Sequence, residues 1–198
     1  MTDPALAALA SDPVVILIFF AWGLLEATVG PIVPDVGLGL LALATPAALG
    51  APLVAAVAGG VVGAQVLASV HRERPALIDR VLAAQPGLGS HGLAESRRRI
   101  ETRGVTRAFA QIGPGLPLKA YVVALVDARP GTTPGELVTL ALLNRLTRLT
   151  PVVAAFALVG VIAHPLDIAT APAIALYLVG WSVFYAAYWR ARRLPQPF

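Results

Sequence analysis

The sequence predicts an all-α, polytopic membrane protein: one domain over residues 1–198, with about four transmembrane helices, two opposed re-entrant hairpins and amphipathic surface helices. The first observation is composition, because 57% of residues are hydrophobic and 13% are charged, whereas a soluble domain is about 25% charged. The mean hydropathy is +0.76. The second observation is a series of apolar stretches long enough to cross about 30 Å of hydrocarbon as helix. The third is a Gly-Pro-x-x-Pro string that interrupts the apolar sequence twice.

The first apolar run extends from Pro13 to about Val29 and is expected to be a transmembrane helix. The residues before it include Asp3 and Asp12 but no lysine or arginine. A signal peptide begins with a basic segment. We therefore expect this run to be a span that the protein retains.

A proline-rich break follows this run directly. Gly30, Pro31 and Pro34 prevent a regular helix, and the apolar segment that resumes after them is too short to cross a bilayer. We expect a re-entrant hairpin, whose irregular backbone must be buried in protein or line a wet cavity. A second full span is expected over residues 48–70, and it completes a first half over residues 13–70.

A basic segment lies between the two halves. Eight of the fourteen arginines fall between positions 72 and 107, and loops rich in lysine and arginine face the cytoplasm. Residues 71–104 are therefore expected to be a cytoplasmic segment of amphipathic helices near the headgroups. The flanking apolar segments favour anionic lipid, and not nucleic acid, as the partner of these charges.

The second half, residues 105–189, repeats the plan of the first. Gly113, Pro114 and Pro117 form the second Gly-Pro-x-x-Pro string, matching the string that begins at Gly30. Because the basic segment is inside, the first hairpin is expected to enter from outside and the second from inside. Many transporters use such an inverted repeat to place broken helices at the middle of the membrane.

Two further spans are expected in the second half, over residues 134–162 and 168–189. The last one ends in tryptophan and tyrosine residues, which are typical of a membrane interface, and a basic cytoplasmic tail over residues 190–198 follows it. Counting spans outward from the basic segment places both termini in the cytoplasm. The expected location is the plasma or inner membrane, with multiple passes.

Several charged residues fall inside apolar segments, where each charge costs roughly 2.5 to 3.5 kcal/mol and therefore needs a partner or a task. The first half contributes acids and the second half contributes cations, including the only lysine of the chain. We predict that the cations and a neighbouring amide bind substrate, and that the acids couple protons or gate the site. The alternative is an ion network that only holds the helices together. The predicted substrate-binding residues are Lys119, Asn144, Arg145 and Arg148, and the predicted proton-coupling or gating residues are Glu26 and Asp35.

The sequence offers little for an enzyme. It contains no cysteine, which excludes disulfides and thiolate chemistry. It has no phosphate-binding loop and no Gly-x-Ser-x-Gly elbow. The three histidines, His71, His91 and His164, are expected in loops without the spacing of metal ligands. We therefore predict no enzymatic activity, no cofactor and no metal site.

Taken together, these residues resemble the DedA family of membrane proteins, also described as the SNARE-associated or VTT domain. The resemblance covers about residues 20–160. It departs from the commoner family pattern at Gln111 and at Lys119, which stand near the places of two family arginines. The residues that carry the resemblance are Glu26, Pro31, Pro34 and Asp35, then the glycine-rich Gly59 to Ala64, then Phe109 and the stretch from Pro114 to Val123, and finally Arg145 and Arg148.

The resemblance implies a proton-linked transporter, or a lipid scramblase or flippase, in which the acids and the hairpin cations are essential. The predicted function is therefore a DedA-like transporter that moves lipids or lipid phosphates between leaflets. Its expected partners are membrane lipids with anionic headgroups, and assembly as a homo-oligomer is left open. The alternatives are a small-solute or ion/proton exchanger, and a non-transporting membrane scaffold or assembly factor.

Overall fold

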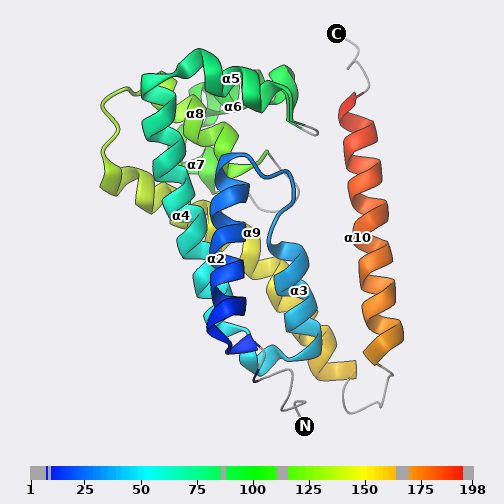
Figure 1. Ribbon diagram of the computed structural model, residues 1–198. Helices are drawn as coiled ribbons and strands as arrows, with labels where there is room; N and C mark the ends of the chain where they lie inside the picture. The colour runs from blue at the N-terminus through cyan, green and yellow to red at the C-terminus, as the bar shows by residue number, and fades with distance from the viewer. Residues whose placement is uncertain (1–7, 9, 86–87, 111–115, 164–169, 194–198) are drawn as a thin grey trace.

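The computed structural model describes residues 8, 10–85, 88–110, 116–163 and 170–193, and within these ranges the chain is helical and contains no strand (Figure 1). The predicted all-α class is confirmed. In chain order the elements are α2 (Pro13–Thr28), α3 (Asp35–Ala44), the 3-10 turn η1 (Pro46–Ala48), α4 (Gly50–Glu73), α5 (Pro75–Ala83), α6 (Gly89–Arg103), α7 (Val105–Phe109), α8 (Leu118–Ala128), α9 (Pro134–Ala163) and α10 (Thr170–Arg193).

Two helices of the described chain, α4 and α9, are long and apolar enough to cross a membrane. Their bounds agree within a few residues with the spans predicted over 48–70 and 134–162. Helices α2 and α3 and the stretch Ile174–Tyr188 of α10 are apolar but shorter.

The ends of α2 and α3 follow from local sequence. Helix α2 begins where Asp12 accepts a hydrogen bond from the backbone N–H of Val14 at 2.7 Å, with Pro13 in the first turn, a combination typical of helix starts. It ends before Gly30 and Pro31. Helix α3 begins directly after Pro34. The carboxylate of Asp35 in its first turn stabilises the helix by its attraction to the positive end of the helix dipole.

Helices α2 and α4 run in the same direction with their backbones in close contact. A Cβ at Gly59 would overlap the carbonyl oxygen of Phe20, and a Cβ at Gly63 would meet the carbonyl oxygen of Leu24 at 2.6 Å. Only glycine permits such an approach, which is how small residues allow helices to pack in membranes. Helix α4 therefore uses its glycines to hold α2.

Helix α9 lies against both α4 and α3 and fixes their directions. It is antiparallel to α4, because Arg72 near the end of α4 donates to the carbonyl of Thr132, just before α9. It is parallel to α3, because Asp35 pairs with Arg148 and the carbonyl of Leu43 meets Gly160. Helices α2 and α3 are therefore antiparallel, and we call them, with residues 29–34, the first hairpin (Figure 1).

The second hairpin consists of α7 and α8. Phe109, at the end of α7, lies beside Asn144 of α9, whereas Asp127, near the end of α8, lies beside His71 near the end of α4. The second hairpin thus runs inward from the end of the molecule that carries α5 and α6, and the first hairpin approaches it from the opposite end. Residues 111–115, with the predicted break residues Gly113 and Pro114, lie outside the described residues. Pro117 directly precedes α8.

This arrangement differs from the expected order of a span followed by a separate hairpin. The apolar run over 13–29 is the first arm of the hairpin, and α3 is its second arm. The start of α2 consequently lies at the end of the molecule away from α5 and α6, whereas α10 finishes at the same end as α5 and α6 (Figure 1). The expectation that both termini lie in the cytoplasm stays a prediction.

Candidate functional site

Polar side chains gather between α4 and α9, where the bend of the first hairpin meets the start of α8. Five of them are buried, and the sixth, Arg148, is half-buried. They come from the end of α2, the start of α3, the start of α8 and the middle of α9. We call this set the ion cluster, and its members are Glu26, Asp35, Lys119, Asn144, Arg145 and Arg148.

Arg145 and Glu26 form the centre of the ion cluster. The Arg145 Nη2 donates to Glu26 Oε2 in an ion pair whose side chains are each 1% exposed. Gly60 of α4 makes the space for this pair, because a Cβ at that position would overlap Nε of Arg145. Any larger residue at this position would force the Arg145 side chain to shift.

Arg148 and Asp35 form the second pair. The Arg148 Nε lies 3.6 Å from Asp35 Oδ2, a distance of charge attraction and not of a good hydrogen bond. Asp35 is 5% exposed in its side chain and Arg148 is 15% exposed. Arg148 is therefore the most accessible charge of the ion cluster.

Lys119 ties the two hairpins together, and Asn144 ties the second hairpin to α9. The Lys119 Nζ donates to the carbonyl oxygen of Gly30 at 2.6 Å, so the cation of the second hairpin binds the bend of the first. The Asn144 Nδ2 donates to the carbonyl oxygen of Phe109 at 2.9 Å and attaches the second hairpin to α9. Both bonds satisfy backbone oxygens that a broken helix leaves open.

The bend of the first hairpin is held by further bonds to its backbone. Trp22 Nε1 donates to the Ile32 carbonyl and Gln85 Nε2 to the Val29 carbonyl, each at 3.0 Å. The Val33 N–H donates to the hydroxyl of Tyr185 in α10 at 3.1 Å. An irregular backbone inside apolar surroundings needs such partners.

The ion cluster is not electrically balanced. Three cations face two carboxylates, which leaves one net positive charge when all are ionised. Several of its buried atoms have no hydrogen-bond partner in the described part of the chain, and buried polar atoms of this kind call for an explanation, such as a bound water or ion. These atoms are Glu26 Oε1, Asp35 Oδ1, Asn144 Oδ1, and Nε and Nη1 of Arg145. The arrangement offers N–H donors and positive charge to an anion.

The structure brings together all six predicted site residues. Of the predicted break residues, Gly30, Pro31 and Pro34 form the bend of the first hairpin, and Gly30 also supplies the acceptor for Lys119. The sequence did not reveal Gly60 as part of the site. Its glycine-rich surroundings indicated helix packing. Only the structure shows that Gly60 also lies against the Arg145 side chain.

A separate polar network lies at the end of the molecule formed by α5 and α6. His71 was expected in a loop but lies in α4, where it is buried and its Nε2 lies 2.8 Å from Asp127 Oδ1. Arg97 of α6 pairs with Asp127 at 2.8 Å and with Asp79 of α5 at 3.1 Å. Burial disfavours the charged guanidinium of Arg97, but hydrogen bonds and attraction to Asp127 and Asp79 outweigh it and raise the pKa of Arg97.

The other two histidines are His91 and His164. His91 was also expected in a loop and lies in α6, and His164 lies outside the described residues. Within the described ranges no three histidine or carboxylate side chains are grouped closely enough to hold a metal ion.

Over the residues that the structure describes, the protein is helical, has two helices of membrane-spanning length, and contains a buried ion cluster between opposed helical hairpins. The chain matches no protein-family model, no curated protein and no solved structure. Its resemblance to the DedA family accordingly stays a prediction.

Proposed function

We propose that the protein is a DedA-like membrane transporter that moves an anionic lipid or lipid phosphate between leaflets, with the ion cluster as its binding site. The observation that carries the proposal is the surplus positive charge of a buried cluster in which Arg145 keeps N–H donors without a partner. Ionisable residues inside a membrane mark binding sites and ion pathways by default. An anionic headgroup would neutralise the surplus charge and satisfy the donors.

In the proposed topology, α4, α9 and α10 cross the membrane and the two hairpins are re-entrant from opposite leaflets. The arginine-rich helices α5 and α6 face the cytoplasm, which places the start of α2 outside and the end of α10 inside. Gly60, behind Arg145, lies about 15 Å along α4 from its start and about 20 Å from its end. The ion cluster thus lies near the middle of the bilayer, where transporters place their sites.

The proposed cycle uses the two acids as exchangeable partners of the arginines. In the empty site Glu26 pairs with Arg145, and Asp35 pairs with Arg148. An arriving anionic headgroup takes over the guanidinium groups, and the released carboxylates take up protons, because an unpaired charge in an apolar interior is costly. When the headgroup leaves toward the other leaflet, the carboxylates lose their protons and return to the arginines.

Transport in liposomes tests the proposal. Purified protein is reconstituted, and labelled anionic lipid is followed between the leaflets. Wild type is expected to accelerate the movement, and Glu26→Gln and Lys119→Ala are each expected to slow it about tenfold or more, which corresponds to about 1.4 kcal/mol of lost barrier stabilisation. Glu136→Gln is the control, because it removes an acid from the exposed Arg129–Glu136 pair of the same protein. No lipid movement with wild type, or movement unaltered by both cluster variants, would reject the proposal.

The alternatives predict other results in the same vesicles. A small-solute or ion/proton exchanger would move protons in the presence of one of a panel of cations and leave the lipid in place. A structural scaffold is favoured by the mutual pairing of Glu26 and Arg145, which needs no ligand to hold the helices together. In that case Glu26→Gln would change thermal stability and the recovery of partners in a pull-down, without any flux.

A further inference from the structure

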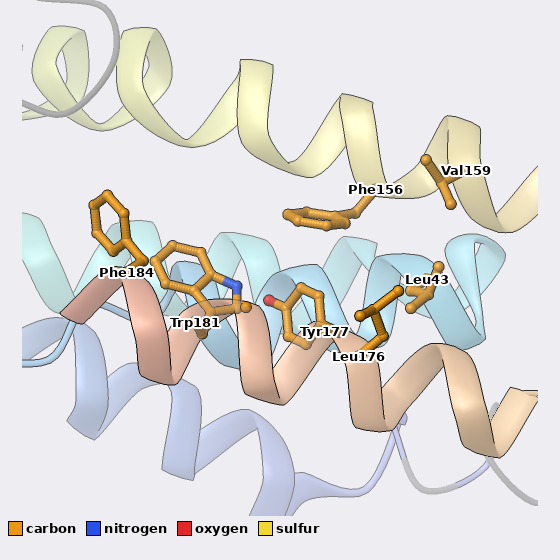
Figure 2. A pocket seen from close by; sticks show the side chains of 8 residues that line it. Leu43, Phe156, Val159, Leu176, Tyr177, Trp181 and Phe184 are labelled. Atoms are coloured by element: carbon orange, nitrogen blue, oxygen red, sulfur yellow. The ribbon is translucent and has the colours of Figure 1, made fainter. Parts of the chain in front are cut away.

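A groove with a volume of about 480 Å³ lies between α9 and α10 and reaches the end of α3. This volume is in the range of ligand sites, about 300 to 1,000 Å³. Figure 2 shows Phe156 and Val159 of α9 facing Tyr177, Trp181 and Phe184 of α10 across it. The lining side chains are aromatic or aliphatic.

The walls of the groove are held in place by aromatic contacts. The rings of Phe156 and Tyr177 meet edge to face at 4.8 Å, and those of Trp181 and Phe184 meet edge to face at 5.5 Å. The Tyr177 hydroxyl donates to the Val36 carbonyl at 2.7 Å and is thereby turned toward α3. The groove therefore presents an apolar surface that one aromatic contact, between Phe156 and Tyr177, joins across the two helices.

One end of the groove lies toward the ion cluster. Phe184 lines this end, and the hydroxyl of the next residue, Tyr185, accepts a hydrogen bond from a backbone N–H in the bend of the first hairpin. The carbonyl oxygen of Asp35, the partner of Arg148, lies 3.3 Å from the hydroxyl of Tyr177 in the groove wall. Arg148, the most accessible cation of the ion cluster, thus lies near the groove without lining it.

A cation near one end of an apolar groove fits an amphiphile. We propose that the groove holds an acyl chain of the transported molecule while Arg148 binds its anionic headgroup. This inference rests on the proposed function and narrows the substrate to an acyl-chain-bearing anion such as an anionic phospholipid. The groove follows α10 from Leu176 to Phe184, about 12 Å. A soluble anion would use the ion cluster and leave the groove without a role.

Gly180 offers a way to fill the groove without disturbing the protein. It lines the groove, and a Cβ at this position meets no atom within 4 Å. Gly180→Phe is expected to occupy the space of the chain, and Gly180→Leu to occupy part of it. Replacing glycine inside a helix also favours the helix, by about 1 kcal/mol at most. Val179→Phe is the matched control, because Val179 is exposed and does not line the groove.

Trp181 can report the occupant, since brominated acyl chains quench tryptophan on contact. The chain has three tryptophans, so Trp22→Phe with Trp189→Phe leaves Trp181 alone. This protein is placed in unbrominated phosphatidylcholine vesicles with a small fraction of brominated phosphatidylglycerol, or with the same fraction of brominated phosphatidylcholine. Quenching by the anionic lipid is expected to be about fivefold stronger, the enrichment typical of one arginine near anionic lipid.

The variants are expected to remove this preference selectively. Gly180→Phe lowers the quenching by the anionic lipid and Gly180→Leu lowers it less, whereas Val179→Phe retains it. Arg148→Gln combined with Asp35→Asn, which leaves neither partner charged, makes the two lipids equivalent. Equal quenching by both lipids in the parent protein, or full selective quenching in both Gly180 variants, would overturn the inference.

Transport measured on the same samples separates this inference from the proposed function. Selective quenching without any movement of lipid between leaflets would keep the groove as a lipid site and reject transport. The opposite result is movement of lipid, or uptake of inorganic phosphate, without selective quenching. It would keep the ion cluster as a transport site and reject the groove as the binding site of the acyl chain.

Discussion

At the scale of the residue, the pair of Glu26 and Arg145 is expected to be strongly coupled. Because both are buried, removing one partner leaves an unpaired charge and costs about 3 to 5 kcal/mol. Glu26→Gln and Arg145→Gln should therefore each lower the free energy of unfolding in detergent by about that amount. The double variant should lose much less than the sum of the two, which a double-mutant cycle measures. Additive losses would show that the two side chains do not pair.

Gly60 gives a second prediction at this scale. In Gly60→Ala the new methyl group would overlap the Arg145 guanidinium, so the ion pair must shift, and a cost of about 1 to 3 kcal/mol is expected. Gly50→Ala in the same helix is the control, because a Cβ there meets nothing within 4 Å. Thermal unfolding of both variants checks the difference. Equal midpoints would mean that Gly60 does not support Arg145.

The sequence predicted the members of the site but not their partners. Charges inside apolar segments are visible without a structure, because each one is costly there, and this identified Glu26, Asp35 and the three cations. Which acid meets which cation depends on helix rotation and depth, and the sequence fixes neither. Gly60 was missed for a related reason, since a glycine in a small-residue stripe serves helix packing equally well.

At the scale of the element, length decides what the apolar run before Gly30 can do. Helix α2 has 16 residues, about 24 Å, whereas the hydrocarbon core is about 30 Å thick. The sequence predicts both the break and a transmembrane span before it, and that span stays a prediction. Direction after a break is set by tertiary contacts, here those of α3 with α9, and these do not follow from the sequence. That the two breaks form re-entrant hairpins stays a prediction.

Helix α6 provides a prediction about pH. Glu95 accepts from Arg99 and Arg98, and the hydrogen bond from Arg99 is the chief reason that its pKa lies below the ordinary 4.5. A carboxyl with a lowered pKa stabilises the fold above its unfolded-state pKa, and this contribution is lost as the pH falls through the folded value. As the pH falls below about 4.5, the free energy of unfolding should therefore decrease in both proteins, and the decrease in wild type should exceed that in Glu95→Gln by up to about 1 kcal/mol.

Unfolding midpoints across this pH range measure the effect. Glu101→Gln, a change of an exposed glutamate on the same helix, should keep the pH dependence of wild type. If Glu95→Gln also keeps it, the pairing of Glu95 with the two arginines does not stabilise α6.

At the scale of the whole molecule, the ion cluster depends on both hairpins at once. Lys119 reaches Gly30 from one end, and Glu26 reaches Arg145 from the other. Neither half of the chain contains a complete site, because the first carries the acids and the second carries the cations. The two halves of the weak sequence repeat therefore form the site only when they face each other. The orientation of each hairpin in the membrane is the property to measure.

Chemical labelling can determine that orientation, because the chain has no cysteine of its own. Single cysteines are introduced at Ser11 before α2, at Ala47 after α3 and at Ser90 on α6, three positions that are exposed. If α2 and α3 form one re-entrant hairpin, a membrane-impermeant maleimide added to intact cells should label Ser11→Cys and Ala47→Cys. Ser90→Cys should react only after the cells are opened, as expected for an arginine-rich cytoplasmic segment. Labelling of Ala47→Cys alone would instead mean that α2 crosses the membrane by itself, and the ion cluster would then need a different arrangement.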